Sequence, residues 1–412
     1  MKIIHVSDLH IGQILYQNYD RVDEHRHFMR QLSEWCDCEQ PDALVVSGDI
    51  FDIQQPSAAV WRFFTEEFVA LHRRVPSMRI IITAGNHDSA SRLAAQRDVW
   101  QLASVDIVAH APAMNYKDLP IGWEDDYIIQ LPTGYILPLP FMAGERSDVV
   151  RHLLDVVAER NTSARPVVLM AHMAVSGCDI TGHDFDIGNL RTQNLDNLGS
   201  GYDYLALGHI HRPQTLRHEA DREADAATYP APVARYCGSA LHVSADEAYP
   251  HTVSVVEIDH HHGTVELRQL RIDQLRHFHT LPLPGSPAIE DAPGALAALR
   301  DFCANHDGAY VRLRIDRSVN LPPEFNQLVY DLIADCGRDI RYNPKIVWTG
   351  QDPDADLTMQ QPEFEVAELQ QMRDPLQFVE RTLHQYPELD LQELRDAFQE
   401  IEEEVRRLDT GK

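Results

Sequence analysis

Five apolar segments, each followed at once by Asp, Asn or His side chains, constrain the fold of this chain more than any other feature. The segments have the length and the β-branched composition of buried parallel strands. Carboxyl ends of parallel strands meet at one edge of a sheet, so we expect the polar residues that follow them to share one crevice. The five motifs are Asp8-Leu9-His10, Gly48-Asp49-Ile50-Phe51-Asp52, Gly85-Asn86-His87-Asp88, Ala171-His172 and Gly208-His209-Ile210-His211.

Amphipathic stretches separate the first three apolar segments. Residues 21–36 and 58–74 have apolar side chains at three- and four-residue spacing, which is typical of helices that cover a sheet. The alternating order of strands and helices predicts an α/β sheet with covered faces. Expected strands are 3–6, 43–47, 80–84, 167–171 and 204–207, and two hairpins are expected, with strands at 127–130 and 135–140 and at 252–258 and 264–271.

The chain changes character near residue 276. A second β-α-β-α-β pattern follows, with strands near 280, at 310–315 and at 340–347 and helices at 288–304 and 323–336. A polar stretch comes next, and residues 375–384 and 389–408 have the spacing of helices. We therefore expect four parts: a main domain at 1–275, a small domain at 276–348, a linker at 349–373 and a helical tail at 374–412.

The tail carries a large share of the negative charge. From residue 351 onward there are 17 Asp and Glu against 6 Lys and Arg, and the formal net charge of the whole chain is -28. The last helix has an apolar stripe, which either packs on its own domain or docks a partner. The stripe consists of Leu391, Leu394, Phe398, Ile401, Val405 and Leu408.

Overall composition bounds the classes of protein that remain. The six cysteines lack paired CxxC spacing, which fits reduced thiols. The amino terminus has no signal-peptide pattern, and no apolar stretch has the roughly 18 residues of a membrane span, so we expect a cytoplasmic protein without a membrane. The charge of -28 opposes binding of a polyanion unless bound cations or a partner supply the attraction.

Spacing within the motifs favours a metal site. A single DxH or HxH is weak because the chain has 22 histidines, but five such motifs in order, each after an apolar strand, are specific. Residues i and i+2 of an extended segment point to the same side, so Asp8 and His10 can form a pair, as can His209 and His211. Glycines at 48, 85 and 208 would permit tight turns.

The ordered set of D-x-H, G-D-x-x-D, G-N-H-D, a single His and G-H-x-H resembles the signature of calcineurin-like metallophosphoesterases. The resemblance implies a β-sheet sandwich flanked by helices, and two divalent metals. Carboxylate, imidazole and amide ligands favour Mn, with Mg or Fe as alternatives, over structural zinc. The resemblance also places Asp49 on both metals. It assigns Asp8, His10 and His211 to one metal and Asn86, His172 and His209 to the other.

The same resemblance gives roles to two residues beside the metals. His87 should face the scissile phosphate and stabilise developing charge or protonate the leaving oxygen. Asp52 should orient His87. The alternative for Asp52 is a helix cap or a surface carboxylate.

Further segments are similar to SbcD, the nuclease subunit of the bacterial SbcC-SbcD complex. That likeness implies a Mn-dependent double-strand exonuclease and single-strand or hairpin endonuclease that acts on DNA, forms a homodimer and works with an SMC-like ATPase. Residues 276–348 would be the α+β capping domain, and the tail would dock the ATPase. The similar segments are residues 1–12, Phe51-Asp52 with Pro56-Ser57, Tyr236-Cys237-Gly238-Ser239 before Glu247, and Asp374-Pro375-Leu376.

Two other functions fit parts of the sequence. A stand-alone nucleotide or cyclic-nucleotide phosphodiesterase would use the same metal motifs, but it needs neither the small domain nor the tail. A metal-free scaffold with a decayed site would lack some ligands, yet all seven positions are filled.

Overall fold

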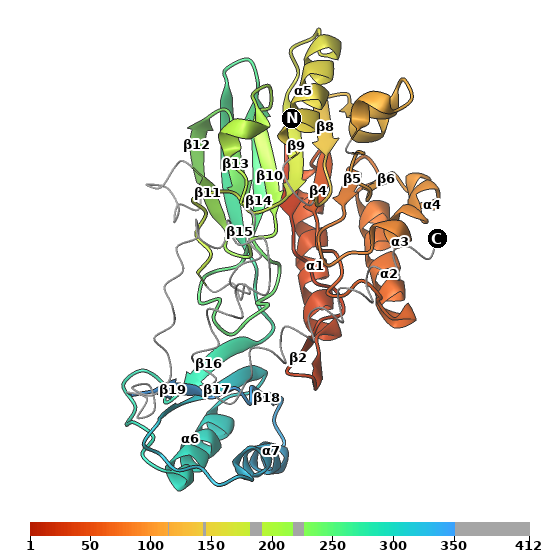
Figure 1. The fold of residues 1–412 in the computed structure, drawn as a ribbon. Helices are drawn as coiled ribbons and strands as arrows, with labels where there is room; N and C mark the ends of the chain where they lie inside the picture. Colours follow the sequence, from red (N-terminus) through yellow and green to blue (C-terminus); the bar gives the residue numbers. More distant parts are fainter. Residues whose placement is uncertain (114, 143–145, 182–191, 217–225, 351–412) are drawn as a thin grey trace, which may run out of the picture. The chain divides into compact units, whose positions relative to one another are not determined.

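Two β-sheets pack face to face in the computed structural model (Figure 1). The structure describes residues 1–113, 115–142, 146–181, 192–216 and 226–350. The first sheet has parallel strands in one half and antiparallel strands in the other. Its order is β12 (Ala226–Pro230), β15 (Thr264–Arg271), β14 (Thr252–Asp259), β1 (Lys2–Val6), β4 (Ala43–Ser47), β5 (Arg79–Thr83) and β6 (Val105–Val108).

The second sheet has a parallel centre, and its two outer strands pair antiparallel with their neighbours. Its strand order is β11 (Gln214–Leu216), β13 (Val233–Tyr236), β10 (Tyr204–Gly208), β9 (Val167–His172), β8 (Gly134–Pro138) and β7 (Ile129–Leu131).

The inner faces of the two sheets form one core, in which Val45, Ile81 and Met170 are fully buried. The outer face of the first sheet packs on helices through Phe28 and Phe64, and the outer face of the second packs on a helix through residues that include Leu153. The expected helix-flanked sandwich is therefore confirmed. The helices are α1 (Val22–Glu39), α2 (Ala58–Arg74), α3 (Ala90–Ala94), α4 (Arg97–Gln101) and α5 (Ser147–Arg160), with short 3-10 turns η1 (Tyr116–Asp118), η2 (Trp123–Tyr127) and η3 (Leu195–Leu198).

Long buried runs account for the strands that the sequence predicted. Every residue of β4 is buried, as expected for a parallel strand covered on both faces. Helix α2 has the predicted bounds, because Ser57 caps its first turn by accepting a hydrogen bond from the Val60 N–H at 3.3 Å. A two-stranded ribbon, β2 (Ile14–Leu15) with β3 (Tyr19–Asp20), was not predicted.

A smaller sheet with two helices follows residue 276 and has its own core, which includes Leu299, Leu313 and Val329. The expected strand at 340–347 is wrong as a single element, because it is divided at Asn343-Pro344 and proline has no N–H for a strand ladder. The elements are β16 (His277–Leu281), α6 (Ala292–Asn305), β17 (Ala309–Asp316), α7 (Phe325–Cys336), β18 (Ile340–Tyr342) and β19 (Val347–Thr349).

Buried charges join this smaller sheet to α1. Arg276 donates to Asp23 at 2.5 Å and to Glu24 at 3.4 Å, and the Tyr310 hydroxyl donates to Glu24 at 2.6 Å. Glu24 also accepts two hydrogen bonds from the buried Arg21 side chain.

Two expectations concern other parts of the chain. The expected linker and tail helices lie outside the described residues, apart from the start of the linker at 349–350. Among the helices that the structure describes, none is long and apolar enough to cross a membrane.

Candidate metal centre

The five polar motifs lie together at the carboxyl ends of β1, β4, β5, β9 and β10, as the sequence predicted. The loop after β1 runs beside the loop after β4, because the Asp8 N–H donates to the Gly48 carbonyl at 3.0 Å and the His10 N–H donates to the Asp49 carbonyl at 3.1 Å. Residues that are far apart in the chain therefore share one crevice between the two sheets.

Four residues of these motifs have a left-handed backbone conformation just after their strands end. The φ angle is 51° at Asp8, 46° at His10, 50° at Asp49 and 95° at His209. Residues with a Cβ adopt this region at a cost of about 1 kcal/mol each, and such conformations are concentrated at functional sites. The expectation of an extended i, i+2 alternation is wrong for Asp8 and His10, although their side chains still meet.

Two glycines bring the strand ends within contact of each other. A Cβ on Gly208 would lie 1.9 Å from the Ser47 carbonyl oxygen, and a Cβ on Gly85 would lie 2.0 Å from Oδ1 of Asp49. No larger residue fits at either position without moving the site. Glycine is needed at both positions because a neighbouring strand end packs directly against its Cα.

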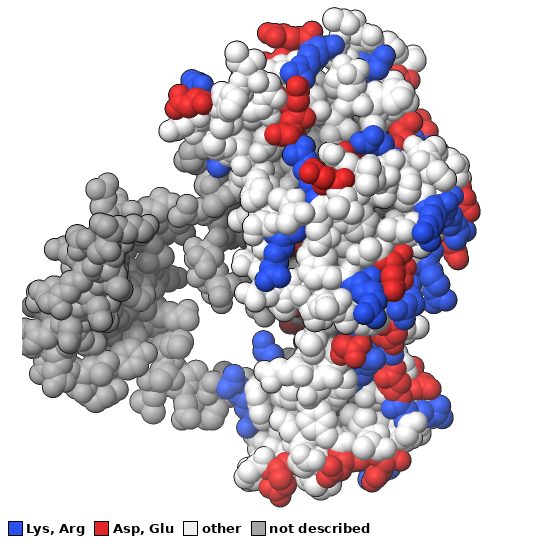
Figure 2. All heavy atoms as spheres, turned by 90° about the vertical axis from the view of Figure 1, so that its right-hand side faces the viewer, with Lys and Arg blue, Asp and Glu red and all other residues white. Residues whose placement is uncertain are grey.

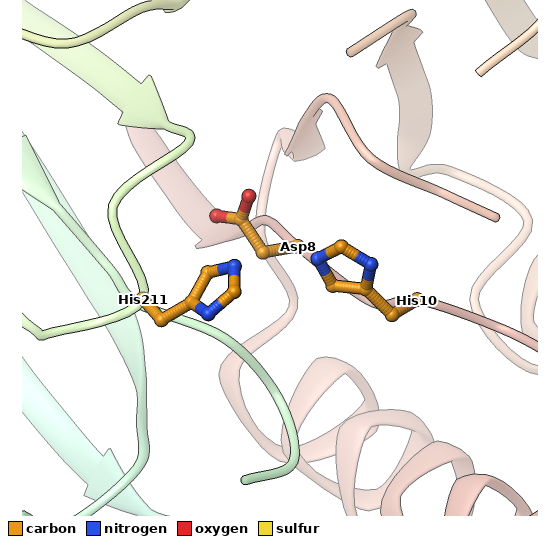
Figure 3. A group of neighbouring side chains, drawn as sticks. All are labelled: Asp8, His10 and His211. Carbon is orange, nitrogen blue, oxygen red and sulfur yellow. The ribbon is translucent and has the colours of Figure 1, made fainter. Parts of the chain in front are cut away.

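Asp8, His10 and His211 form the first group of possible ligands. One ligand atom from each lies within 4.8 Å of those of the other two, and all three residues are buried. Figure 3 shows one ring nitrogen of His211 and one of His10 directed toward Asp8. Within the described part of the chain, Nε2 of His10 is buried and has no hydrogen-bond partner, as a nitrogen reserved for a cation would be.

Asp49, Asn86, His172 and His209 form the second group. Oδ1 of Asn86 lies 3.0 Å from Nε2 of His172 and 2.9 Å from Nδ1 of His209. Nδ1 of His172 donates to the Ser47 carbonyl at 2.8 Å, so Nε2 is the nitrogen that faces the group and would bind a cation in exchange for its proton. These donors fit a divalent cation, and no thiolate is among them.

Asp49 lies between the two groups. Its Oδ2 is 3.3 Å from Nε2 of His172 and 3.9 Å from Nε2 of His10. Burial lowers the pKa of His172, but the Asp49 carboxylate and, more weakly, Asp8 raise it to about 9. Burial alone would raise the pKa of Asp49, whereas His172, His10 and His87 hold it below its ordinary value. The negative field that retains protons on the imidazoles would also attract cations.

His87 faces the open side of this centre. It is exposed, its N–H donates to Oδ1 of Asp49 at 2.8 Å, and its Nδ1 donates to the backbone carbonyl of Asp52 at 2.8 Å. The Asp52 carboxylate turns elsewhere, with Oδ1 at 3.3 Å from Nδ1 of His10. Asp52 thus contacts His87 through its backbone, while its carboxylate contacts His10.

The centre opens into a cleft of about 1250 Å³. Its lining includes His87, Asn86 and His209 of the centre, together with residues that follow position 276. The latter include Arg312 and residues 343–347. A volume of this size exceeds that of one small phosphoester ligand.

Sequence reasoning gave no role to two buried carboxylates at the site. Asp88 accepts from the N–H groups of Ile50, Phe51 and Gly85 at 2.8–3.0 Å and so ties the loop after β4 to the loop after β5. Burial and the nearby charge of Asp49 raise the pKa of Asp88 to about 6. Asp88 could have been found from its place in the G-N-H-D motif.

The second carboxylate, Glu247, contacts His211 from the loop between β13 and β14. That loop has no strand or helix pattern that would have indicated the contact.

Comparison with known proteins agrees with this geometry. A family model described as calcineurin-like phosphoesterase matches residues 1–213. The chain is 29% identical to the SbcD subunit of nuclease SbcCD from Rhodobacter capsulatus over 77% of this chain and 82% of that protein. It is 28% identical to the subunits of the same name from Escherichia coli and Bacillus subtilis, over 62% of this chain and 65% and 66% of those proteins. The alignments thus span just under two thirds of these last two relatives.

Proposed function

The chain belongs to the calcineurin-like phosphoesterase family, and we propose that it is a Mn-dependent nuclease subunit that acts on DNA with an SMC-like ATPase. Its activities would be double-strand exonuclease and single-strand or hairpin endonuclease. The support for the substrate is the likeness to relatives that are named as the SbcD subunit of nuclease SbcCD.

The observation that carries the proposal is the position of Asp49, with one carboxylate oxygen near ligands of both groups. In the proposed assignment, Asp8, His10, Asp49 and His211 hold one cation, and Asp49, Asn86, His172 and His209 hold the other. Two bound cations would supply Lewis-acid activation of the phosphoryl group and a water of lowered pKa. His87, on the cleft side, would stabilise charge or donate a proton at the leaving oxygen.

Charge on the chain restricts how DNA is held. The net charge is -28, and Figure 2 shows Lys and Arg intermixed with Asp and Glu on the face that it presents. Basic side chains do line the cleft: Arg146, Arg312 and Lys345. Arg312 is paired with Asp246 at 2.6 Å, whereas Lys345 has no ion pair among the described residues. Local cations and a partner would therefore supply most of the attraction for DNA.

The proposal also assigns roles to the smaller domain and to the C-terminal tail. Residues 276–348 would act as a cap over the cleft, and the acidic tail at 374–412 would dock the ATPase. The protein would be a homodimer, which light scattering on the purified chain can test.

The test uses the full-length chain, alone and with an SMC-like ATPase subunit taken from a related complex. Linear duplex DNA, hairpin-ended duplex and single-stranded DNA are compared with nucleotides and cyclic nucleotides, in Mn²⁺, in Mg²⁺ and with a chelator. We expect Mn²⁺-dependent cleavage of duplex ends and hairpins. The variant Asp49→Asn, purified in parallel, should be inactive and excludes a contaminating nuclease.

Hydrolysis of nucleotides without cleavage of any DNA, under all these conditions, would refute the nuclease proposal. It would favour a stand-alone nucleotide phosphodiesterase. Cleavage that persists in the chelator would refute the dependence on metal.

A further inference from the structure

We propose that Glu247 is the positioning residue for His211, and that it fixes the ring nitrogen which His211 presents to the first metal. The inference rests on the proposed metal centre and adds a residue to it. Glu247 is 1% exposed and lies in the loop between β13 and β14. A carboxylate that is buried so completely needs partners, and its partners identify what it does.

One oxygen of Glu247 contacts the proposed ligand. Oε1 lies 2.9 Å from Nδ1 of His211. Because Oε2 is already held by other donors, Oε1 is the oxygen that faces Nδ1. With Nδ1 donating to Oε1, the lone pair of the ring is left on Nε2, where a metal would need it. Figure 3 shows a ring nitrogen of His211 turned toward Asp8 and His10. The hydrogen bond therefore selects both the tautomer and the ring orientation that a metal requires.

The other oxygen of Glu247 is held by its own loop. Oε2 accepts from the Val243 N–H at 3.0 Å and from the Ser239 hydroxyl at 3.4 Å. The carboxylate is thus fixed at both oxygens and cannot rotate away from His211.

The loop is in turn joined to the backbone of two proposed ligands. The Ser239 N–H donates to the His211 carbonyl at 3.0 Å, and the Ala240 N–H donates to the Asp8 carbonyl at 3.4 Å. His251, which is buried, donates from Nδ1 to the Ser239 carbonyl at 2.8 Å. Glu247 therefore keeps a constant position relative to the ligands that it serves.

Glutamine in place of Glu247 cannot satisfy the same partners. The amide has one oxygen, and if that oxygen accepts from His211, the NH₂ group meets the Val243 N–H, which is also a donor. The shape of the side chain is kept, so Glu247→Gln separates the hydrogen bond from packing. Loss of such a contact typically weakens metal affinity by about 10- to 100-fold.

The experiment titrates MnCl₂ into the metal-free full-length chain by calorimetry. Wild type, Glu247→Gln and Ser239→Ala are compared with Glu266→Gln, a control that removes an exposed carboxylate from β15. We expect one of two Mn²⁺ sites to weaken by about 10- to 100-fold in Glu247→Gln. A smaller loss is expected in Ser239→Ala, and wild-type binding in the control. Mn²⁺ retained after desalting should fall from two per chain to one.

Thermal melting of the metal-free variants distinguishes positioning from packing. If Glu247→Gln melts at a lower temperature but binds Mn²⁺ as wild type does, Glu247 is only structural and the inference is wrong. If Glu247→Gln does not fold, unchanged Mn²⁺ affinity in Ser239→Ala would contradict the inference, and weakened affinity would support it. If wild type itself binds no Mn²⁺, the proposed function fails first.

Discussion

The Asp52 backbone carbonyl accepts a hydrogen bond from Nδ1 of His87 at 2.8 Å. The Asp52 carboxylate lies 3.3 Å from His10 instead. A substitution at Asp52 removes the second contact and keeps the first, because the backbone carbonyl remains. The two contacts of this residue can therefore be separated by mutation.

Asp52→Ala should weaken Mn²⁺ binding by about tenfold, since His10 loses the carboxylate beside its Nδ1. Turnover at saturating Mn²⁺ should stay within severalfold of wild type, because His87 keeps its carbonyl partner. The measurements are Mn²⁺ affinity by calorimetry and the rate on a small phosphodiester over a range of Mn²⁺ concentrations. Asp301→Ala, an exposed acid on α6, serves as the control. Loss of turnover at saturating Mn²⁺ with unchanged affinity would instead support the orienting role that the family resemblance implies.

His87→Gln should remove most turnover and keep metal binding. His87 is exposed to the cleft and belongs to neither proposed ligand set, so its loss removes charge stabilisation or proton donation at the leaving oxygen. A positioned acid contributes about 10²- to 10⁴-fold to rate. Single-turnover rates and Mn²⁺ affinity are measured beside His261→Gln, an exposed histidine in a turn. Joint loss of binding and turnover would mean that His87 is a ligand.

Gly85→Ala should damage the centre without touching a ligand side chain. The added Cβ would lie 2.0 Å from Oδ1 and 2.2 Å from the backbone nitrogen of Asp49, so Asp49 must move. Overpacking of this kind costs about 1–3 kcal/mol, and Mn²⁺ affinity should fall with it. Gly263→Ala is the matched control, because φ is +62° there with no atom within 4 Å. That control should lose about 1 kcal/mol of stability and bind Mn²⁺ normally. Normal Mn²⁺ binding by Gly85→Ala would show that the loops can separate.

The sequence predicted the strands because their burial is continuous. Residues of β4 and β9 are all buried, and an apolar run of that length admits few alternatives. The ligand types were also predictable, since each follows such a run. The division of the last strand was recognisable in principle from Pro344, which lacks an N–H.

Three features of the site were beyond sequence reasoning. Left-handed backbone at Asp8, His10 and Asp49 is not encoded by glycine and is imposed by hydrogen bonds between loops that are distant in sequence. Glu247 reaches His211 from a loop that has no periodic pattern. Its segment is similar to a known family, but neither spacing nor polarity indicates that its carboxylate contacts a histidine. The role of Asp52 likewise depends on which of its oxygens faces His87.

Acid should weaken the contact between α1 and the smaller sheet. Burial alone would raise the pKa of Asp23, but the hydrogen bond and charge of Arg276 lower it below its ordinary value of 3.8. A carboxyl with a lowered pKa in the folded state stabilises the fold above its unfolded pKa, and that contribution is lost as pH falls through the folded pKa. Below about pH 4, wild type should therefore lose stability more steeply than Asp23→Asn in urea unfolding monitored by fluorescence. Equal slopes would contradict a role for this ion pair.

Removal of residues 351–412 should separate hydrolysis from assembly. Residues 1–348 form a compact unit that contains every proposed ligand, and the shortened chain also keeps β19 intact. The shortened chain should hydrolyse a small phosphodiester at the wild-type rate, because it retains every described residue that lines the cleft. It should fail to co-purify with the ATPase, since the acidic tail with its apolar stripe is the proposed docking element. A full-length variant with Leu394 and Phe398 changed to Ser tests the stripe alone. Retention of the ATPase by the shortened chain would place the docking surface within residues 1–350.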